Sequence, residues 1–455
     1  MTGRSSVLLP SPHLSWGGRV GYGIGDFAFN LFFTTASLFL LFYYTDVLGL
    51  TPAVAGWVFA GALIWDAIFD PWIGYIASRT RTRWGRYRPY VLLGALPLAA
   101  SWALMFLPTT LGGSALVLFA AATHILFRTM FAVVGMPFLA MSAVLTRDSA
   151  ERGVLAGIRM VAGAAAGLFG AVATLKLVTA FGGGQTGFFW TAVLYGALAT
   201  AILIFVFTAT REAPVLEDEP RPAVGEMIRM LSSNRAFWLV SAAMLLGAVG
   251  QTFFQKTLPY FFKYQLGRED LISPALGILA ASVMVSIPAW TWLSKRTSKR
   301  TMWLTGSVVG VVGSVLLWVI PETPSNVLPV LILVGAGAGA SYLGFWSMIP
   351  DTVEFGEWRS GVRAEGAVFG LVSLIQKASL GLAAAGLGEA LSAIGYTANV
   401  AQTPATLASM RFLMIVLPAI LLVAAAAVIA FYPLDQQTHR RIVRVLGRRR
   451  ARLPQ

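Results

Sequence analysis

The sequence contains no cysteine among its 455 residues, which excludes disulfide bonds, thiolate metal sites and cysteine nucleophiles. Charged residues are also scarce: they make up 12% of the chain, against about a quarter in soluble globular proteins. Residues 1–18 lack a hydrophobic run long enough for a cleavable signal peptide, so we expect the first hydrophobic segment to direct membrane insertion. The low charge excludes an ordinary soluble protein.

Apolar sequence is abundant instead: 57% of the residues are hydrophobic, and the mean hydropathy is +0.72. A bilayer core requires about 20 consecutive apolar residues per helix, and twelve segments of the chain meet this requirement. The sequence therefore predicts an all-α membrane protein with twelve transmembrane helices. These segments are residues 20–45, 53–78, 89–107, 114–142, 153–181, 188–210, 235–262, 271–294, 301–320, 326–350, 364–395 and 408–433.

A mixed-charge stretch from Arg211 to Arg235 is the widest gap between the predicted helices and divides them into six plus six. Two such halves are typical of the major facilitator architecture, in which a central cavity lies between two six-helix bundles. Within the gap, residues 224–231 could form a short amphipathic helix on the membrane surface. The predicted domains are residues 1–210 (first bundle), 211–234 (cytoplasmic linker), 235–434 (second bundle) and 435–455 (basic cytoplasmic tail).

The chain carries a formal charge of +14, and its pI is near 10.3. The basic residues lie mainly in short loops after every second predicted helix and in the tail, which is the orientation signal of membrane proteins. The positive-inside rule therefore predicts a multi-pass protein of the cell membrane with both termini in the cytoplasm. We expect a small-molecule solute and the lipid bilayer as partners, no nucleic acid, and a monomeric state.

Two acidic residues lie inside the second predicted helix, within GALIWDAIFDPWIGYIASR (residues 61–79). A carboxylate near the middle of a membrane helix costs about 2.5–3.5 kcal/mol on insertion scales, so a residue of this kind is a functional candidate. Asp66 and Asp70 are four residues apart and share one helical face, where they could bind a cation or a proton. The structural alternative is that they only hydrogen-bond to neighbouring helices.

Four more charged residues are predicted at membrane depth: Asp26, Arg128, Arg159 and Lys377. The buried acids and bases then balance, and their ion pairs could form, break or exchange with a cation, as an alternating-access symporter requires. Static pairing predicts the same composition. His124 lies one turn from Arg128 on the same face and could either carry a proton or form only a helix contact.

Two further groups of residues are candidates for binding and gating. Tyr22 and Trp346 could stack on a sugar ring or a lipid chain, although most membrane aromatics pack or form interfacial belts. Charged residues at the cytoplasmic helix ends could form ion pairs that close an inner gate, or could belong to solvated loops. The predicted gate residues are Arg147, Asp148, Arg152, Asp351, Glu354, Glu357 and Arg363.

Three stretches of the sequence resemble one transporter family. They are YYTDVLGL (residues 43–50), IWDAIFDPWIGYIASRTRTRWGRYRPY (residues 64–90) and MIPDTVEFGEWRSGVRAEGAVFG (residues 348–370). These stretches are similar to the glycoside–pentoside–hexuronide:cation symporter family, the melibiose permease group within the major facilitators. The likeness extends from Gly21 to the C-terminal tail.

The resemblance implies roles for five of the charged residues. Asp66 and Asp70 would bind the coupling Na⁺, Li⁺ or H⁺, and Lys377 would lie near this cation site. Asp26 and Arg159 would contact the sugar hydroxyls. These roles agree with the chemistry, because oxygen ligands suit a hard cation and a carboxylate with a guanidinium can bind vicinal hydroxyls.

The fourth predicted helix departs from the family pattern. Galactoside-transporting members carry an Asp and a Trp around a Pro-Phe pair and a Thr that assists Na⁺, whereas this chain has Gly135, Leu139 and Ala132 there. These replacements argue against a galactoside, weaken the case for Na⁺ and keep H⁺ as an equal candidate. Arg128 stands where an acid or neutral residue would be expected, which gives weight to an anionic substrate such as a uronide.

We interpret the sequence as a secondary active symporter that couples H⁺ or Na⁺ entry to uptake of a glycoside or related polar organic solute. It requires no cofactor beyond the coupling ion, and any Na⁺ would bind at Asp66 and Asp70. The alternative is a cation-coupled transporter of lysophospholipid or another amphipathic solute, because relatives of this family in animals move lysophospholipids. A membrane enzyme or sensor on a transporter fold is a minor alternative that no catalytic motif in the sequence supports.

Overall fold

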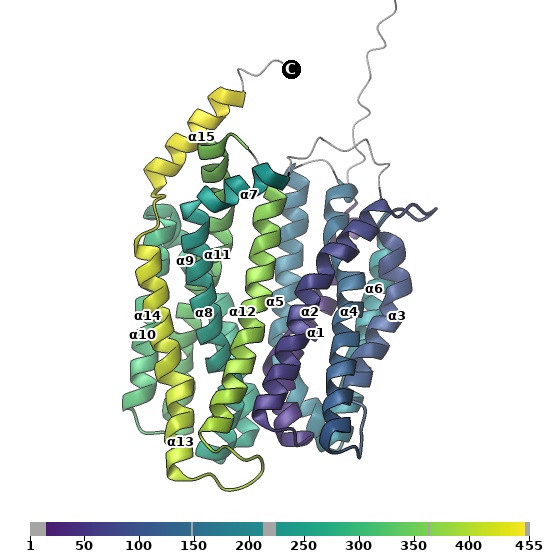
Figure 1. Ribbon diagram of the computed structural model, residues 1–455, viewed down its shortest axis with the longest axis vertical. Coiled ribbons are helices and arrows are strands. Elements are labelled where there is room, and N and C mark those ends of the chain that lie inside the picture. Colours follow the sequence, from purple (N-terminus) through teal and green to yellow (C-terminus); the bar gives the residue numbers. More distant parts are fainter. Residues whose placement is uncertain (1–14, 147–148, 213–223, 363–364, 451–455) are drawn as a thin grey trace, which may run out of the picture.

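The computed structural model describes residues 15–146, 149–212, 224–362 and 365–450. Over these residues the regular structure is helical, apart from one isolated β-bridge between Thr82 and Gly85. The long helices run side by side through the molecule, and the first and last described residues, at the start of α1 and the end of α15, lie at the same end (Figure 1).

The first half contains six long helices in chain order. They are α1 (Trp16–Phe42), which continues as the π-helical turn η1 (Tyr43–Val47), α2 (Pro52–Arg79), α3 (Arg88–Met105), α4 (Gly113–Leu145), α5 (Ser149–Ala180) and α6 (Gly184–Ala209). The second half begins with the short α7 (Val224–Ser233), as the amphipathic pattern of residues 224–231 predicts. The following elements are α8 (Arg235–Tyr260), the π-helical turn η2 (Phe261–Gln265), the 3₁₀ turn η3 (Glu269–Leu271), α9 (Ile272–Arg296), α10 (Lys299–Val319), α11 (Pro324–Ser360), α12 (Glu365–Ala393), α13 (Pro404–Arg411), the π-helical turn η4 (Phe412–Val416), α14 (Leu417–Ala430) and α15 (Gln436–Arg450).

Eleven of the described helical segments are long and apolar enough to cross a membrane. The remaining predicted span corresponds to α3, an 18-residue helix that begins at Arg88 and packs against α4 and α6. A helix therefore occupies each of the twelve predicted positions, and the predicted all-α membrane fold is confirmed.

Two spans differ from their predicted bounds. Helix α11 continues past residue 350 to Ser360, so Asp351 lies on a helix and not in a loop. Gly361, with a φ of 74°, ends α11 in the left-handed conformation that glycine adopts without strain. The last predicted span is divided into α13, η4 and α14, and Pro418 near the start of α14 lacks the N–H needed for a regular helical ladder.

Each half has its own helix packing, and three helix pairs join the halves. Within the first half α1 packs against α5 and α6, and within the second half α8 packs against α14 and α10 against α11. Between the halves, α2 packs along α12, α5 along α9 and α1 against α8.

Glycines bring α2 and α12 into close contact. A Cβ atom on Gly56 would lie 2.7 Å from the carbonyl oxygen of Ala384, and one on Gly388 would lie 2.3 Å from that of Pro52. Only glycine fits at these positions without a shift of the backbone. The contact lies toward the end of the molecule opposite the termini.

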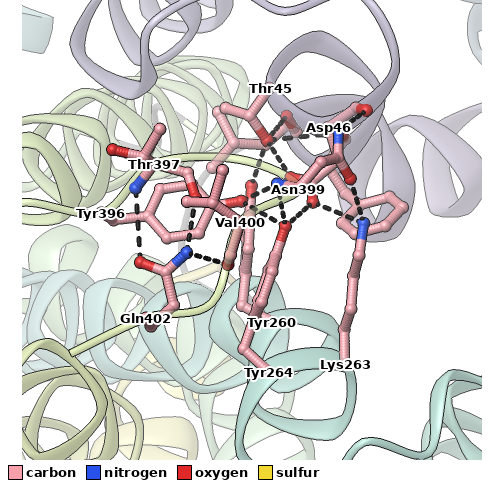
Figure 2. Close-up of polar contacts among 12 residues, drawn as sticks. Thr45, Asp46, Tyr260, Lys263, Tyr264, Tyr396, Thr397, Asn399, Val400 and Gln402 are labelled. Carbon is pink, nitrogen blue, oxygen red and sulfur yellow. Dashed lines mark hydrogen bonds and ion pairs between the residues drawn. The ribbon is translucent and has the colours of Figure 1, made fainter. Parts of the chain in front are cut away.

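A polar network joins the halves at that same end (Figure 2). The Asp46 carboxylate accepts hydrogen bonds from Lys263 Nζ at 2.9 Å and from the Tyr396 hydroxyl at 2.8 Å. The Tyr264 hydroxyl also donates to Asp46, and Asn399 Nδ2 donates to the Asp46 carbonyl oxygen at 2.8 Å. Burial and then the nearby Asp46 charge raise the pKa of the Tyr396 hydroxyl, which keeps this donor neutral. The network therefore ties the end of α1 to residues that follow α8 and α12.

Replacing Asp46 with alanine is expected to destabilise the protein, because the Lys263 ammonium and the hydroxyls of Tyr264 and Tyr396 lose their shared acceptor. Loss of one partner from a buried ion pair costs up to about 3–5 kcal/mol. The thermal unfolding midpoint of the purified protein, followed by tryptophan fluorescence, should therefore fall. Asp270→Ala is the matched control, since Asp270 pairs with Arg268 while its side chain is 60% exposed. An equal fall in both variants would contradict a structural role for the network.

Candidate functional site

The centre of the interface between the halves holds a group of charged side chains. Lys377 Nζ on α12 lies 2.9 Å from Asp66 Oδ2 and also forms a short ion pair with Asp70 on the facing helix α2. Asp66 is 1% exposed and Asp70 is 8% exposed. One ammonium group is thus shared by two buried carboxylates from the opposite half of the molecule.

The four-residue spacing explains why both carboxylates reach the same ammonium, since residues one turn apart lie on the same helical face. The oxygens of Asp66 make no hydrogen bond to any described residue, so the Asp66 carboxylate depends on ionic contacts. Asp66 and Asp70 are therefore the described groups best suited to hold a coupling cation, in the place that the Lys377 ammonium fills. The structure brings together the three residues that the sequence grouped as the cation site.

Arg128 is part of this charged group. It is 2% exposed on α4, and its Nη1 lies 3.8 Å from Asp66 Oδ2. Its Nε donates to Nε2 of the fully buried His124 at 3.4 Å. The sequence makes Arg128 a candidate for binding an anionic substrate, whereas the structure places it against the acid pair. Hydropathy gives the depth of a residue but not the direction of its side chain, so the sequence could not identify this partner.

The charges in the group balance. Two carboxylates, from Asp66 and Asp70, face two basic side chains, from Arg128 and Lys377. Arg128 is sealed in the first half, while the Lys377 side chain is 23% exposed. Lys377 is thus the cation of the group that can leave, and its departure would leave one net negative charge.

Asp26 and Arg159 form a second, partly buried ion pair, between α1 and α5. Arg159 donates to Asp26 Oδ1 from Nη2 at 2.9 Å and from Nε at 3.2 Å. Asn30, which the sequence analysis did not identify, donates to Asp26 Oδ2 at 3.3 Å. The Asp26 and Arg159 side chains remain 16% and 21% exposed, so part of the pair is accessible.

Tyr22 and Trp346 lie in different places relative to this pair. Tyr22 is fully buried and donates to the Phe138 carbonyl at 3.1 Å, and the Arg159 guanidinium lies 5.8 Å from its ring. Trp346 belongs to α11 in the second half, where it lines a cavity together with Tyr342. Tyr22 therefore packs beside the Asp26–Arg159 pair, whereas Trp346 lies on another element in the second half.

Asp351 and Glu354, two of the predicted gate residues, pair with residues of the second half. Lys299 Nζ donates to both carboxylate oxygens of Asp351 at 2.8 Å, and His439 Nε2 lies 2.6 Å from Glu354 Oε2. His439 belongs to α15. The Asp435 carboxylate caps the start of α15 by accepting a hydrogen bond from the backbone N–H of Thr438 at 2.7 Å, and this bond holds the pKa of Asp435 below its usual value. Nothing in the sequence pattern pointed to His439 as a partner.

The inner-gate prediction is only partly described by the structure. Arg147, Asp148 and Arg363 lie outside the described residues, as does the side chain of Arg152. Glu357 is buried on α11. Ligand atoms of Asp351, Glu354 and His439 lie within 4.8 Å of one another, but Lys299 already neutralises Asp351. The gate role of these residues stays a prediction.

Comparison with known proteins identifies the family. Residues 21–436 match the family described as MFS/sugar transport protein. An isoprimeverose transporter of Lactiplantibacillus pentosus is 33% identical over 433 residues, which cover 92% of this chain and 89% of the relative. A glucuronide carrier protein homolog of Escherichia coli strain K12 is 28% identical over 444 residues, which cover 94% of this chain and 95% of the relative. Among solved structures, a bacterial homolog of the human lysosomal transporter Spinster shares the fold with a TM-score of 0.69 at 12% identity, covering 94% of this chain and 98% of that chain.

The matched region includes the charged residues on α1, α2, α4, α5 and α12, and thus every residue of the two charged groups. The family and these relatives are transporters, so the chain is a multi-pass membrane transporter and not an enzyme. The family resemblance seen in the sequence is confirmed. The chain belongs to the MFS/sugar transport family, among the glycoside–pentoside–hexuronide:cation symporters of the major facilitator superfamily.

Proposed function

We propose that the protein is a secondary active symporter that couples entry of H⁺ or Na⁺ to uptake of a glycoside or related polar solute by alternating access. The observation that carries this proposal is the Lys377 ammonium held between Asp66 and Asp70 where the two halves meet. A cation that binds the carboxylates takes the place of the ammonium. Cation binding and separation of α2 from α12 are then thermodynamically linked.

The acid pair is the proposed site of the coupling ion. Arg128 already supplies a fixed positive charge beside Asp66, so one mobile cation restores the balance once Lys377 leaves. A proton needs a single carboxylate oxygen, whereas a hard metal cation prefers several oxygen ligands. Ala132 on α4 offers no hydroxyl to Na⁺. These features favour H⁺ over Na⁺.

The solute is proposed to bind at Asp26 and Arg159. Both side chains are partly accessible, and hydrogen bonds from sugar hydroxyls to charged groups are stronger than those to neutral ones. The relatives named for isoprimeverose and glucuronide support a sugar-derived solute. A lysophospholipid or another amphipathic solute is the alternative that the uptake assay below tests.

The distribution of basic residues supports an orientation with both termini in the cytoplasm. The Asp46 network then lies on the extracellular side, and the Asp351 cluster on the cytoplasmic side. We propose that the transporter works as a monomer in the cell membrane, since one chain supplies both charged groups.

Asp66→Asn and Asp70→Asn are each expected to abolish accumulation of solute against its gradient, because a neutral amide cannot exchange the ammonium for a coupling ion. The test is uptake of isoprimeverose, an uncharged disaccharide, and of methyl glucuronide into proteoliposomes. Inward H⁺ and Na⁺ gradients are imposed separately. Wild-type protein should concentrate solute under one gradient, while each variant should only equilibrate it.

Asp270→Asn is the control for this experiment, because Asp270 is an exposed acid outside the charged groups. Fully concentrative uptake by both the Asp66→Asn and Asp70→Asn variants would overturn the cation-site assignment. Movement of lysophosphatidylcholine with no movement of either sugar would favour the amphipathic alternative.

Asp26→Asn and Arg159→Gln are expected to raise the KM for the transported sugar by about 10- to 100-fold, since a hydrogen bond to a charged group contributes about 1.5–3 kcal/mol. The ion that drives uptake should stay the same in both variants. Initial rates in the same proteoliposomes give KM, and Arg268→Gln is the exposed control. An unchanged KM in both variants would place the solute elsewhere.

A further inference from the structure

The second half of the protein encloses a cavity of about 290 Å³. Helices α8, α9, α10, α11, α12 and α14 supply its wall, so the cavity lies within the second bundle. Its volume is near the lower end of the range of about 300–1,000 Å³ that is usual for small-molecule sites. The cavity can thus hold one ring-sized group.

The wall of the cavity carries carboxamides and no charged side chain. Gln251 and Gln255 are one turn apart on α8 and share a face, and Gln376 reaches the cavity from α12. None of these three amides hydrogen-bonds to another side chain or to the backbone in the part of the chain that the structure describes. Each therefore has one acceptor oxygen and two donor hydrogens free for a ligand or water.

A buried indole also lines the cavity. Trp303 is 1% exposed, and its Nε1 has no hydrogen-bond partner among the described residues. This N–H exposes almost no surface, so a molecule in the cavity would meet the indole ring and not its N–H. Trp303 therefore adds an aromatic face to the wall of the cavity.

Small residues create the space. A Cβ atom on Gly247 would meet no atom within 4 Å, and Ala243, Ala248 and Ala338 also form the wall. Larger side chains at these positions would fill the bundle, as in an ordinary helix core. The volume of the cavity therefore results from small residues on several helices.

The polar groups discriminate between classes of ligand. A sugar hydroxyl both donates and accepts, so a sugar ring can pair with all three amides, and the faces of Trp346 and Tyr342 can pack on its C–H groups. An acyl chain would leave the three amides unpaired, which is unfavourable. An anionic group would find no base in the wall.

The cavity adjoins both charged groups. Gln376 in its wall directly precedes Lys377, which reaches the acid pair in the other half. Tyr342 in its wall is close enough to Asp26 to interact with it electrostatically. A molecule held at Asp26 therefore has the cavity within reach across the interface.

We propose that this cavity binds an uncharged sugar ring, namely the second ring of a disaccharide or glycoside whose first ring contacts Asp26 and Arg159. This inference rests on the proposed transport of sugars and specifies the substrate class as two-ring compounds with one neutral ring. The second bundle thus contributes directly to solute recognition, through Gln251, Gln255 and Gln376.

A single cysteine tests the proposal directly, because the natural chain contains none. Gly247→Cys places a thiol in the open space of the cavity, and its labelling by N-ethylmaleimide is timed on purified protein. Isoprimeverose at about four times its Kd should slow labelling about fivefold, since the empty fraction falls by 1 + [L]/Kd. Leu245→Cys is the control: Leu245 is 41% exposed on the same helix, and its labelling rate should not change.

The other outcomes decide against the proposal. Isoprimeverose, methyl glucuronide and lysophosphatidylcholine are each tested as protecting agents. Protection by the lysolipid alone, or by none of the three, would overturn the assignment of a sugar ring to the cavity. If wild-type protein still concentrates either sugar in that case, the proposed transport function stands and only the cavity assignment fails.

Transport variants supply a second test. Gln251→Leu should raise the KM for isoprimeverose about 2- to 10-fold, the effect of one neutral hydrogen bond, and leave the KM for the single-ring xylose unchanged. Gly247→Phe should exclude the second ring and reduce disaccharide uptake further, while Leu245→Phe on the outer face should not. Equal effects on the disaccharide and on xylose would argue against a separate subsite.

Discussion

The architecture depends on one ion-pair group, in which a single ammonium from α12 is shared by two carboxylates from α2. Neither acid is tolerable alone in this environment, because an unpaired buried charge is strongly destabilising. The halves are therefore held together at their centre by a bond that another positive charge can replace. Arg128 makes the replacement of the Lys377 ammonium possible, since it stays beside Asp66. With Lys377 withdrawn, Asp66, Asp70 and Arg128 together carry only one net negative charge.

Among the described residues, the contacts between the halves extend from this centre toward one end only. The glycine contacts of α2 with α12 and the Asp46 network both lie on the side opposite the termini. Pairs at the other end stay within one half, such as Lys299 with Asp351 in the second half and Arg19 with Glu151 in the first. The structure thus combines closure at one end with a central bond that bridges the halves, which is one of the states that alternating access requires.

Much of this arrangement follows from the sequence, and the limits have physical causes. Hydropathy predicts every long helix, and the four-residue spacing of Asp66 and Asp70 predicts their common face. The partner of Arg128 could not be predicted, because charge and depth do not fix the direction in which a helix faces its neighbours. The cavity was missed for a related reason: it arises from small residues on several helices, none of which is unusual alone. The end of α11 was placed too early because charged residues resemble a loop, although they also fit a helix that extends beyond the membrane.

The adjacency of Gln376 and Lys377 has a mechanical consequence. Consecutive residues on a helix point about 100° apart, so one side chain serves the cavity while the next serves the acid pair. Any roll or tilt of α12 displaces both together, and neither can shift independently. A solute bound by the Gln376 amide would resist the helix motion that withdraws the Lys377 ammonium from the acid pair. A coupling ion that displaces this ammonium would in turn disturb the contact between Gln376 and the solute. Because α12 is a single rigid helix, it can in this way work as an interlock, which limits uncoupled movement of either the ion or the solute.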